Sequence, residues 1–201
     1  MTERDGENAK PSDRSSGVPE NPKPFPPFGV ARSDRIYHSP WGGMRRDIVR
    51  LASGAEREYH IFEIGDAAVV VPVLPDGRIV LIGQYRYPHG KTHWELPAGR
   101  LHENEAPIDA ARRELREETG YRSARLEPLP GFYPSNGITA HYAHAFVALD
   151  CEWDGELQLD DTEQLVVKTF TREEIGRLLD AGRIQDAFAA ISLMYWLRRS
   201  R

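Results

Sequence analysis

The sequence predicts a mixed α/β fold in which a central β-sheet lies between helices. Three observations predict it. Residues 67–73 (AAVVVPV) form a nearly continuous apolar run, which is typical of a buried strand. The turn signal Pro75-Asp76-Gly77 follows and indicates a hairpin, with residues 78–85 returning as the partner strand. Residues 107–119 repeat apolar side chains at helical period, so strands and a helix share this chain of 201 residues.

The N-terminal part divides into a tail and a strand-rich segment. Residues 1–29 are rich in Pro, Ser, Asn, Glu and Lys, and such a stretch buries too little to offset its ordering entropy, so we expect it to be disordered. Residues 34–38, 44–51 and 57–63 alternate polar and apolar side chains and indicate antiparallel strands. We expect one folded domain over residues 30–201.

The helix predicted over residues 107–119 has a defined start and end. Pro107 suits the first turn, where its missing N–H is not needed, and Gly120 suits the left-handed position just past the end. One face is apolar and would lie on the core: Ile108, Ala111, Leu115 and Thr119. The opposite face carries three acidic side chains, three and four residues apart: Glu114, Glu117 and Glu118.

This acidic trio favours a metal site. Like charges at such spacing repel by about 0.2–0.5 kcal/mol per pair, a cost that a cation among them removes. Hard oxygen ligands suit Mg²⁺ or Mn²⁺ with a phosphorylated substrate. Arg113 lies four residues before Glu117 and can pair with it or with Glu105. Taken as charges alone, the run RRELREE is also typical of a solvated surface helix.

Further elements follow the helix. Strands are predicted over residues 124–132, 142–149 and 164–170. Thr171 and Glu174 have the spacing of a capping box, so a helix should begin there. A last helix, over about residues 185–198, carries large side chains that favour a core or an interface over a cofactor site: Phe188, Ile191, Met194, Tyr195 and Leu197.

Composition excludes some classes of protein. The formal net charge of −5 gives no indication of nucleic acid or an anionic membrane as a partner. No apolar run approaches eighteen residues, so no membrane span is expected, and the first residues lack an apolar signal segment. The single cysteine, Cys151, excludes an internal disulfide and fits a reducing cytoplasm.

Residues 99–121 carry a longer pattern around the acidic trio. They read glycine, five residues, glutamate, seven residues, then Arg-Glu-apolar-x-Glu-Glu-x-Gly-apolar. This resembles the signature of the Nudix hydrolases, with Tyr121 the one unusual choice, at the final apolar place. The resemblance implies the Nudix-type α/β/α sandwich with a mixed central sheet, plus N-terminal antiparallel strands.

Three other segments resemble one branch of that family. GQYRYP at 83–88, WELPAG at 94–99 and GFYPSNGIT at 131–139 are similar to hydrolases of ADP-ribose and other nucleoside diphosphate sugars. The implied reaction is attack of water on the pyrophosphate bond, so that ADP-ribose would give AMP and ribose 5-phosphate. Two or three Mg²⁺ or Mn²⁺ ions would polarise phosphate oxygens and lower the pKa of bound water.

The resemblance also implies the ligands of these ions. Glu114 and Glu118 would be the main carboxylate ligands, and Glu117 a further ligand or one that bridges through water. The backbone carbonyl of Ala98 would supply another oxygen, and Gly99 would allow the chain to approach the ions closely.

Three residues are candidates for substrate binding. Arg86 would bind the pyrophosphate, since its planar fork suits phosphate oxygens; the alternative is a surface arginine at a strand end. Trp41 lies where related enzymes carry an aromatic that stacks on adenine, although a structural tryptophan is nearly as plausible from sequence. Tyr59 is a weaker candidate for the other face of the base. The resemblance further implies a homodimer whose N-terminal strands reach across to a second subunit.

One departure concerns the general base. Related ADP-ribose hydrolases often carry a glutamate in a downstream loop, in a pattern like G-F-T-D-E, whereas residues 137–141 here read GITAH. His141 falls at the place of the glutamate and can accept a proton near neutral pH. Glu117 and Glu163 are the alternatives, as is a loop histidine that only contacts substrate or nothing.

Two other functions stay open. One is a hydrolase that prefers GDP- or UDP-linked sugars. The other is a non-catalytic module that binds a nucleotide sugar, which the intact signature and the lack of room for a helix-turn-helix domain disfavour.

Overall fold

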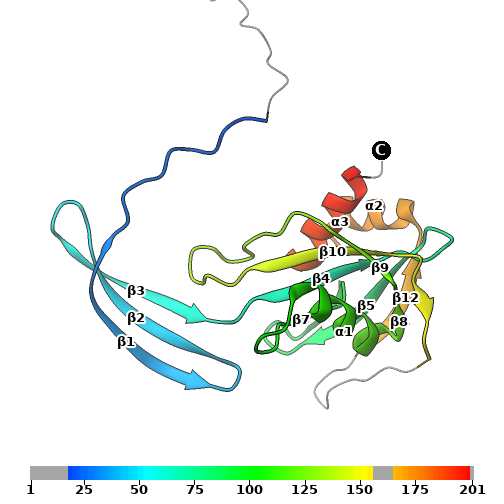
Figure 1. The fold of residues 1–201 in the computed structure, drawn as a ribbon, viewed down its shortest axis with the longest axis horizontal. Coiled ribbons are helices and arrows are strands. Elements are labelled where there is room, and N and C mark those ends of the chain that lie inside the picture. The colour runs from blue at the N-terminus through cyan, green and yellow to red at the C-terminus, as the bar shows by residue number, and fades with distance from the viewer. Residues whose placement is uncertain (1–17, 156–164, 200–201) are drawn as a thin grey trace, which may run out of the picture.

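A computed structural model describes residues 18–155 and 165–199. Figure 1 shows a body of strands and helices, from which a sheet of three N-terminal strands projects to one side. The strands are β1 (Gly29–Ser39), β2 (Gly42–Arg50), β3 (Glu56–Glu63), β4 (Ala67–Pro72), β5 (Ile79–Arg86), β6 (Lys91–Glu95), β7 (Ala98–Arg100), β8 (Tyr121–Arg122), β9 (Arg125–Pro128), β10 (Ala143–Leu149), β11 (Glu152–Trp153) and β12 (Leu165–Phe170). The helices are α1 (Pro107–Thr119), α2 (Arg172–Asp180) and α3 (Ala187–Arg199).

The strands of the body form two main sheets. One has the order β7-β4-β10-β9 and the other the order β12-β5-β6. β4 and β10 run parallel, whereas β7 pairs antiparallel with β4 and β9 antiparallel with β10. The fold is therefore mixed α/β with a mixed central sheet, as predicted.

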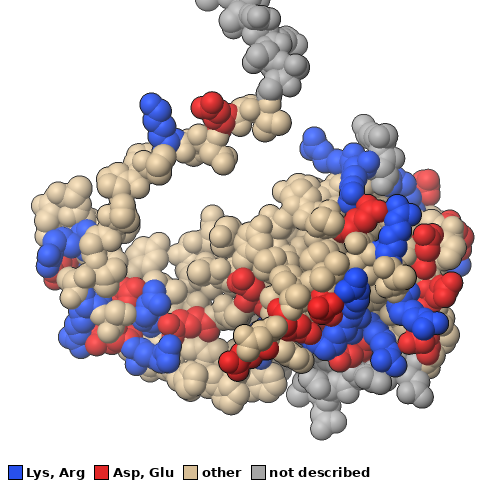
Figure 2. Space-filling model, in the orientation of Figure 1, with Lys and Arg blue, Asp and Glu red and all other residues tan. Residues whose placement is uncertain are grey.

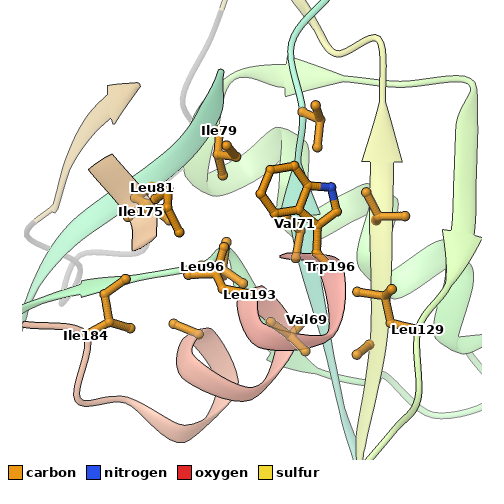
Figure 3. Packing of buried hydrophobic residues seen from close by; sticks show 14 of the residues in the cluster. Val69, Val71, Ile79, Leu81, Leu96, Leu129, Ile175, Ile184, Leu193 and Trp196 are labelled. Carbon is orange, nitrogen blue, oxygen red and sulfur yellow. The ribbon is translucent and has the colours of Figure 1, made fainter. Parts of the chain in front are cut away.

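The sandwich is visible in the burial of β4. Val69 and Val71 belong to the core on the side of α2 and α3, while Ala68 and Val70 belong to the core on the side of α1. Successive side chains of a strand point to opposite faces, so β4 is covered by helices on both. Figure 3 shows Trp196 of α3 lying beside Val71 in the first of these cores.

The prediction that residues 78–85 pair with β4 as a hairpin was wrong. The turn does form, because the Gly77 amide donates to the Leu74 carbonyl at 2.9 Å and Gly77 has a φ of +82°. Beyond the turn, however, β4 and β5 share a single bridge between Val73 and Ile79. β5 then pairs with β12 and β6, since β4 already has partners in β10 and β7.

The helix ends confirm the predicted capping. α1 spans Pro107–Thr119, and Gly120 is left-handed at φ +70°. Thr171 and Glu174 form the reciprocal bonds of a capping box at the start of α2. None of the helices in the described ranges is long and apolar enough to cross a membrane.

The large side chains of the last helix divide between the core and the surface. Phe188 and Leu197 pack against the core, but Met194 and Tyr195 are 49% and 37% exposed. The side chains that are buried instead are Ala189, Ser192, Leu193 and Trp196. Their spacing of three and four residues forms one stripe along the helix, and Phe188 and Leu197 flank it.

The N-terminal sheet has the order β1-β2-β3, and its strands are longer than predicted. It is attached to the body through β3, where the Phe62 amide donates to the Ile138 carbonyl at 2.8 Å. The Tyr59 hydroxyl donates to the Gly137 carbonyl at 3.3 Å. These contacts fix β3 against the loop that precedes β10.

Candidate functional site

α1 approaches the sheet closely at β7. A Cβ atom at Gly99 would lie only 1.9 Å from the Oε1 atom of Glu114, so glycine alone allows this approach. One turn further along α1, the Glu118 carboxylate accepts the Ala98 amide at 2.9 Å. Both glutamates are at least nine-tenths buried. Two carboxylates are thus held beneath the strand, and neither belongs to a solvated surface face.

Arg113 joins the acidic side chains of α1. Its guanidinium donates two bonds of 2.9 Å to the Glu105 carboxylate, and its Nη1 atom donates to Glu114 at 2.6 Å and to Glu117 at 3.1 Å. It therefore pairs with both of the partners considered from sequence. This guanidinium lowers the pKa of Glu105 to about 2. The carboxylates in turn raise the pKa of Arg113, and the hydrogen bonds that it donates to Glu105 contribute most.

The donor set fits a hard divalent cation in chemistry. Glu114, Glu117 and Glu118 line one cleft together with Ala98, and a positive group, the Arg113 guanidinium, already lies against two of these carboxylates. As they stand, no three His, Cys, Asp or Glu side chains within residues 18–155 and 165–199 surround a common metal position.

Two clefts meet at β7. The carboxylate cleft, of about 1210 Å³, contains the three glutamates of α1 together with Trp41, Gln84, Tyr85, Tyr87 and Leu101. The histidine cleft, of about 500 Å³, contains Ile64, His89, His93, Glu95, His141, Asp186 and Phe188. The residues common to both are Arg86, Pro88, Ala98, Gly99 and Arg100.

Arg86 lies on this shared wall. It makes a bidentate pair with the buried carboxylate of Glu95, with Nη2 to Oε2 at 2.6 Å and Nε to Oε1 at 3.0 Å. That hydrogen bonding raises the pKa of Arg86 above its usual value. The side chain is still 44% exposed, so the guanidinium is oriented by Glu95 while it faces both clefts.

Asp186 is a site residue that the sequence reasoning missed. Its carboxylate accepts the Ala189 amide at 2.8 Å and so caps α3, and it lines the histidine cleft. Burial raises the pKa of Asp186, and the nearby negative charge of Glu95 raises it further. An aspartate just before a helix is a recognisable capping signal, but nothing in the sequence indicates that the cap faces Glu95.

His141 lies in the histidine cleft and is not among the residues that line the carboxylate cleft. Its Nδ1 atom bonds the carbonyl of Gly65, which can only accept, so Nδ1 carries the proton. Nε2 is then the acceptor nitrogen of the neutral ring. Glu163, the alternative base, lies outside the described residues.

The two aromatic candidates have different surroundings. Trp41 lines the carboxylate cleft of its own chain and is 75% exposed. Tyr59 is not among the residues that line either of the two clefts, and its hydroxyl is engaged by Gly137. The N-terminal sheet thus brings Trp41 to the cleft by the turn between β1 and β2.

Comparisons with known proteins show the family of this chain. The NUDIX domain model matches residues 64–190. An ADP-ribose pyrophosphatase of Bacillus subtilis (strain 168) is 32% identical over 148 residues, which cover 73% of this chain and 80% of that protein. One of Mycobacterium tuberculosis (strain ATCC 25618 / H37Rv) is 34% identical over 169 residues, covering 83% and 82%.

A solved structure shares the fold. The crystal structure of an ADP compounds hydrolase superimposes with a TM-score of 0.78 at 20% identity, covering 89% of this chain and 98% of that one. The family model spans more than half of the chain, and the relatives exceed 30% identity over more than two thirds of it. The chain therefore belongs to the Nudix hydrolase family.

Proposed function

We propose that residues 30–201 hydrolyse the pyrophosphate bond of ADP-ribose or a related nucleoside diphosphate sugar, with Mg²⁺ or Mn²⁺ as cofactor. The products would be a nucleoside monophosphate and a sugar phosphate. The names of the relatives support the substrate class. The observation that carries the proposal is the meeting of two clefts at Arg86, directly beside the buried carboxylates of α1.

The shape suits a molecule with two ends and a diphosphate between them. The carboxylate cleft has aromatic side chains, Trp41, Tyr85 and Tyr87, that suit a flat base. The histidine cleft has polar groups that suit sugar hydroxyls, among them His93 and Asp186. Arg86, oriented by Glu95, would bind the diphosphate where the clefts join.

Two or three ions would be held by Glu114, Glu118 and the carbonyl of Ala98, with Glu117 as a further ligand. When bound, they would neutralise phosphate charge and make a water molecule nucleophilic. Gly99 leaves the room that Glu114 needs beside β7. Arg113 would keep the carboxylates together and compensate their charge in the absence of ions.

The proton acceptor is proposed from three candidates. Glu117 lines the carboxylate cleft, and His141, whose Nδ1 atom is engaged by Gly65, lines the adjacent cleft. Glu163 is the third. The pH–rate profile of His141→Ala tests the histidine, because an unaltered profile would remove it from the role of base.

We further propose a cytoplasmic homodimer. Within the described chain, β1 and β3 leave large apolar side chains exposed, which is typical of an interface: Val30, Ile36, Tyr37, Tyr59 and Phe62. In such a dimer Tyr59 would reach the second face of a base. The free, buried thiol of Cys151 suits a reducing compartment. Sedimentation equilibrium at micromolar concentration tests the dimer, and a monomer would contradict it.

A substrate panel tests the reaction. ADP-ribose, ADP-glucose, GDP-mannose and UDP-glucose are incubated with Mg²⁺, and nucleoside monophosphate is measured; EDTA should abolish its release. Preference for GDP- or UDP-sugars would replace ADP-ribose as substrate. Tight binding without turnover in Mg²⁺ or Mn²⁺ would identify a binding module and contradict hydrolysis.

A further inference from the structure

The turn between β1 and β2 touches β7, although 59 residues separate the two in sequence. The Arg100 Nη1 atom donates to the backbone carbonyl of Trp41 at 2.8 Å. The guanidinium carbon of the same arginine lies 5.4 Å from the centre of the Trp41 ring, within the range of a cation–π contact. One side chain of the body thus contacts both the backbone and the ring of Trp41.

The backbone of this turn is already fixed locally. Ser39 accepts the Trp41 amide at 3.2 Å and donates to the Gly42 carbonyl at 3.0 Å. Gly42 has a φ of +144°, and a Cβ there would lie 3.0 Å from the Glu63 carbonyl. The indole itself is 75% exposed, so packing does little to orient it. The Arg100 guanidinium is the group that can set the direction of the ring.

Arg100 also contacts the acidic helix. Its backbone carbonyl accepts from the Arg113 Nη2 atom at 3.1 Å, and Arg113 is the cation that joins Glu105, Glu114 and Glu117. The side chain of Arg100 lies on the wall shared by both clefts. Arg100 therefore links the carboxylates to Trp41, the aromatic that the turn between β1 and β2 places on the carboxylate cleft.

We propose that Arg100 is a positioning residue that holds Trp41 as a wall of the carboxylate cleft, and so sets the affinity for the base of the substrate. The inference rests on the proposed function for its substrate. The chemistry that Arg100 serves is stacking of a large flat base, so its effect should be greater for adenine nucleotides than for uridine nucleotides.

A double-mutant cycle tests the coupling. Arg100→Ala should raise KM for ADP-ribose about fivefold and leave kcat within twofold, because the lost contacts serve binding of the base. In the Trp41→Ala background, Arg100→Ala should change KM no further. Arg100→Lys should restore part of the affinity, since lysine keeps the charge but loses the planar fork. Arg57→Ala, at an exposed arginine of β3, is the control and should leave KM unchanged. Additive effects, or a fall in kcat alone, would overturn the proposal.

A second measurement needs no turnover. In protein labelled with 5-fluorotryptophan, the ¹⁹F resonance of Trp41 is assigned by its loss in Trp41→Phe. Arg100→Ala should shift this resonance and leave those of Trp94, Trp153 and Trp196 in place. If the wild type hydrolyses none of the sugars, AMP affinity by calorimetry replaces KM, and the proposed function fails separately. An unmoved Trp41 resonance, or an AMP affinity that Arg100→Ala leaves equal, overturns the role of Arg100 alone.

Discussion

The junction between α1 and β7 differs from the N-terminal sheet in how deeply its charged side chains are buried. At the junction, Glu114 and Glu118 are almost fully buried, and the chain accommodates them with Arg113 and a backbone amide. On the N-terminal sheet only Asp47, paired with Arg45, is buried to that degree among the described charged residues, while ion pairs such as Arg35–Glu63 lie at the surface, and Figure 2 shows positive and negative side chains intermingled there. Buried charges are costly to disturb, whereas surface pairs contribute little. The junction also holds the proposed metal ligands, so substitutions there should lower kcat. Substitutions on the N-terminal sheet, which places Trp41 at the cleft, should mainly lower the affinity for substrate.

The largest effect is expected at Glu118. Glu118→Gln keeps an acceptor for the Ala98 amide but removes the charge, so kcat for ADP-ribose with Mg²⁺ should fall at least about a hundredfold. Thermal unfolding followed by circular dichroism should show the fold intact. A rate close to that of the wild type would remove Glu118 from the metal site.

Gly99→Ala should have the next largest effect. The new methyl group would overlap the Glu114 carboxylate, so either β7 or that side chain must move, with a loss of about tenfold or more in kcat and about 1–3 kcal/mol in stability. The matched control is Gly176→Ala in α2, where nothing lies within 4 Å and alanine favours a helix by up to about 1 kcal/mol. Urea unfolding and steady-state kinetics measure both. Equal behaviour of the two variants would contradict a close fit at β7.

The ion pair of Glu105 with Arg113 should make the stability of the fold depend on pH in the acidic range. Its folded pKa is about 2 against an ordinary 4.5, because Arg113 stabilises the carboxylate. The resulting stability is fully present above pH 4.5 and is lost as the pH falls toward 2. Urea titrations across this range should show that Glu105→Gln costs about 1–3 kcal/mol at pH 7 and much less at pH 2, where the folded carboxylate is already partly protonated. The control, Glu103→Gln at an exposed position, should change neither; a cost for Glu105→Gln that is independent of pH would contradict the ion pair.

The smallest effect should come from the sheet. Trp41→Ala should raise KM for ADP-ribose about tenfold with kcat unchanged, because stacking of a base contributes about 1–3 kcal/mol. Steady-state kinetics over the substrate panel measures it. An unchanged KM would return Trp41 to a structural role, and a lost kcat would show that the sheet takes part in the chemistry.

Local signals in the sequence predicted what local forces decide. Pro107 and Gly120 set the bounds of α1, and Thr171 with Glu174 set the start of α2, because each acts within one helical turn. Partner choice in a sheet depends on distant strands, so the turn after β4 was found while its partner, β10, was not. Among the large side chains of α3, Phe188 and Leu197 pack on the core whereas Met194 and Tyr195 do not, because distant elements decide which face of the helix is covered.

The same limit applies to the candidate site. The acidic trio and Arg86 were found from spacing and resemblance, and their roles stay predictions. Glu95 and Arg100 carried no signal of their own, since each matters through a neighbour distant in sequence, Arg86 and Trp41. Asp186 carried only the signal of a helix cap, and its place beside Glu95 had none. Ion pairs and caps of this kind become visible only when the chain is folded.

β4 and β5 are joined by one bridge, between Val73 and Ile79, and beyond it they belong to different sheets. The ends of these strands that lie away from the bridge, at Ala67 and Arg86, are about 20 Å from it along each strand, and both residues line the histidine cleft. A tilt of about 3° between the two sheets would shift those ends by about 1 Å, which is enough to change a rate a hundredfold. Side chains packed around the bridge are remote from any reacting atom, yet they would then set the distance between Ala67 and Arg86 across the histidine cleft.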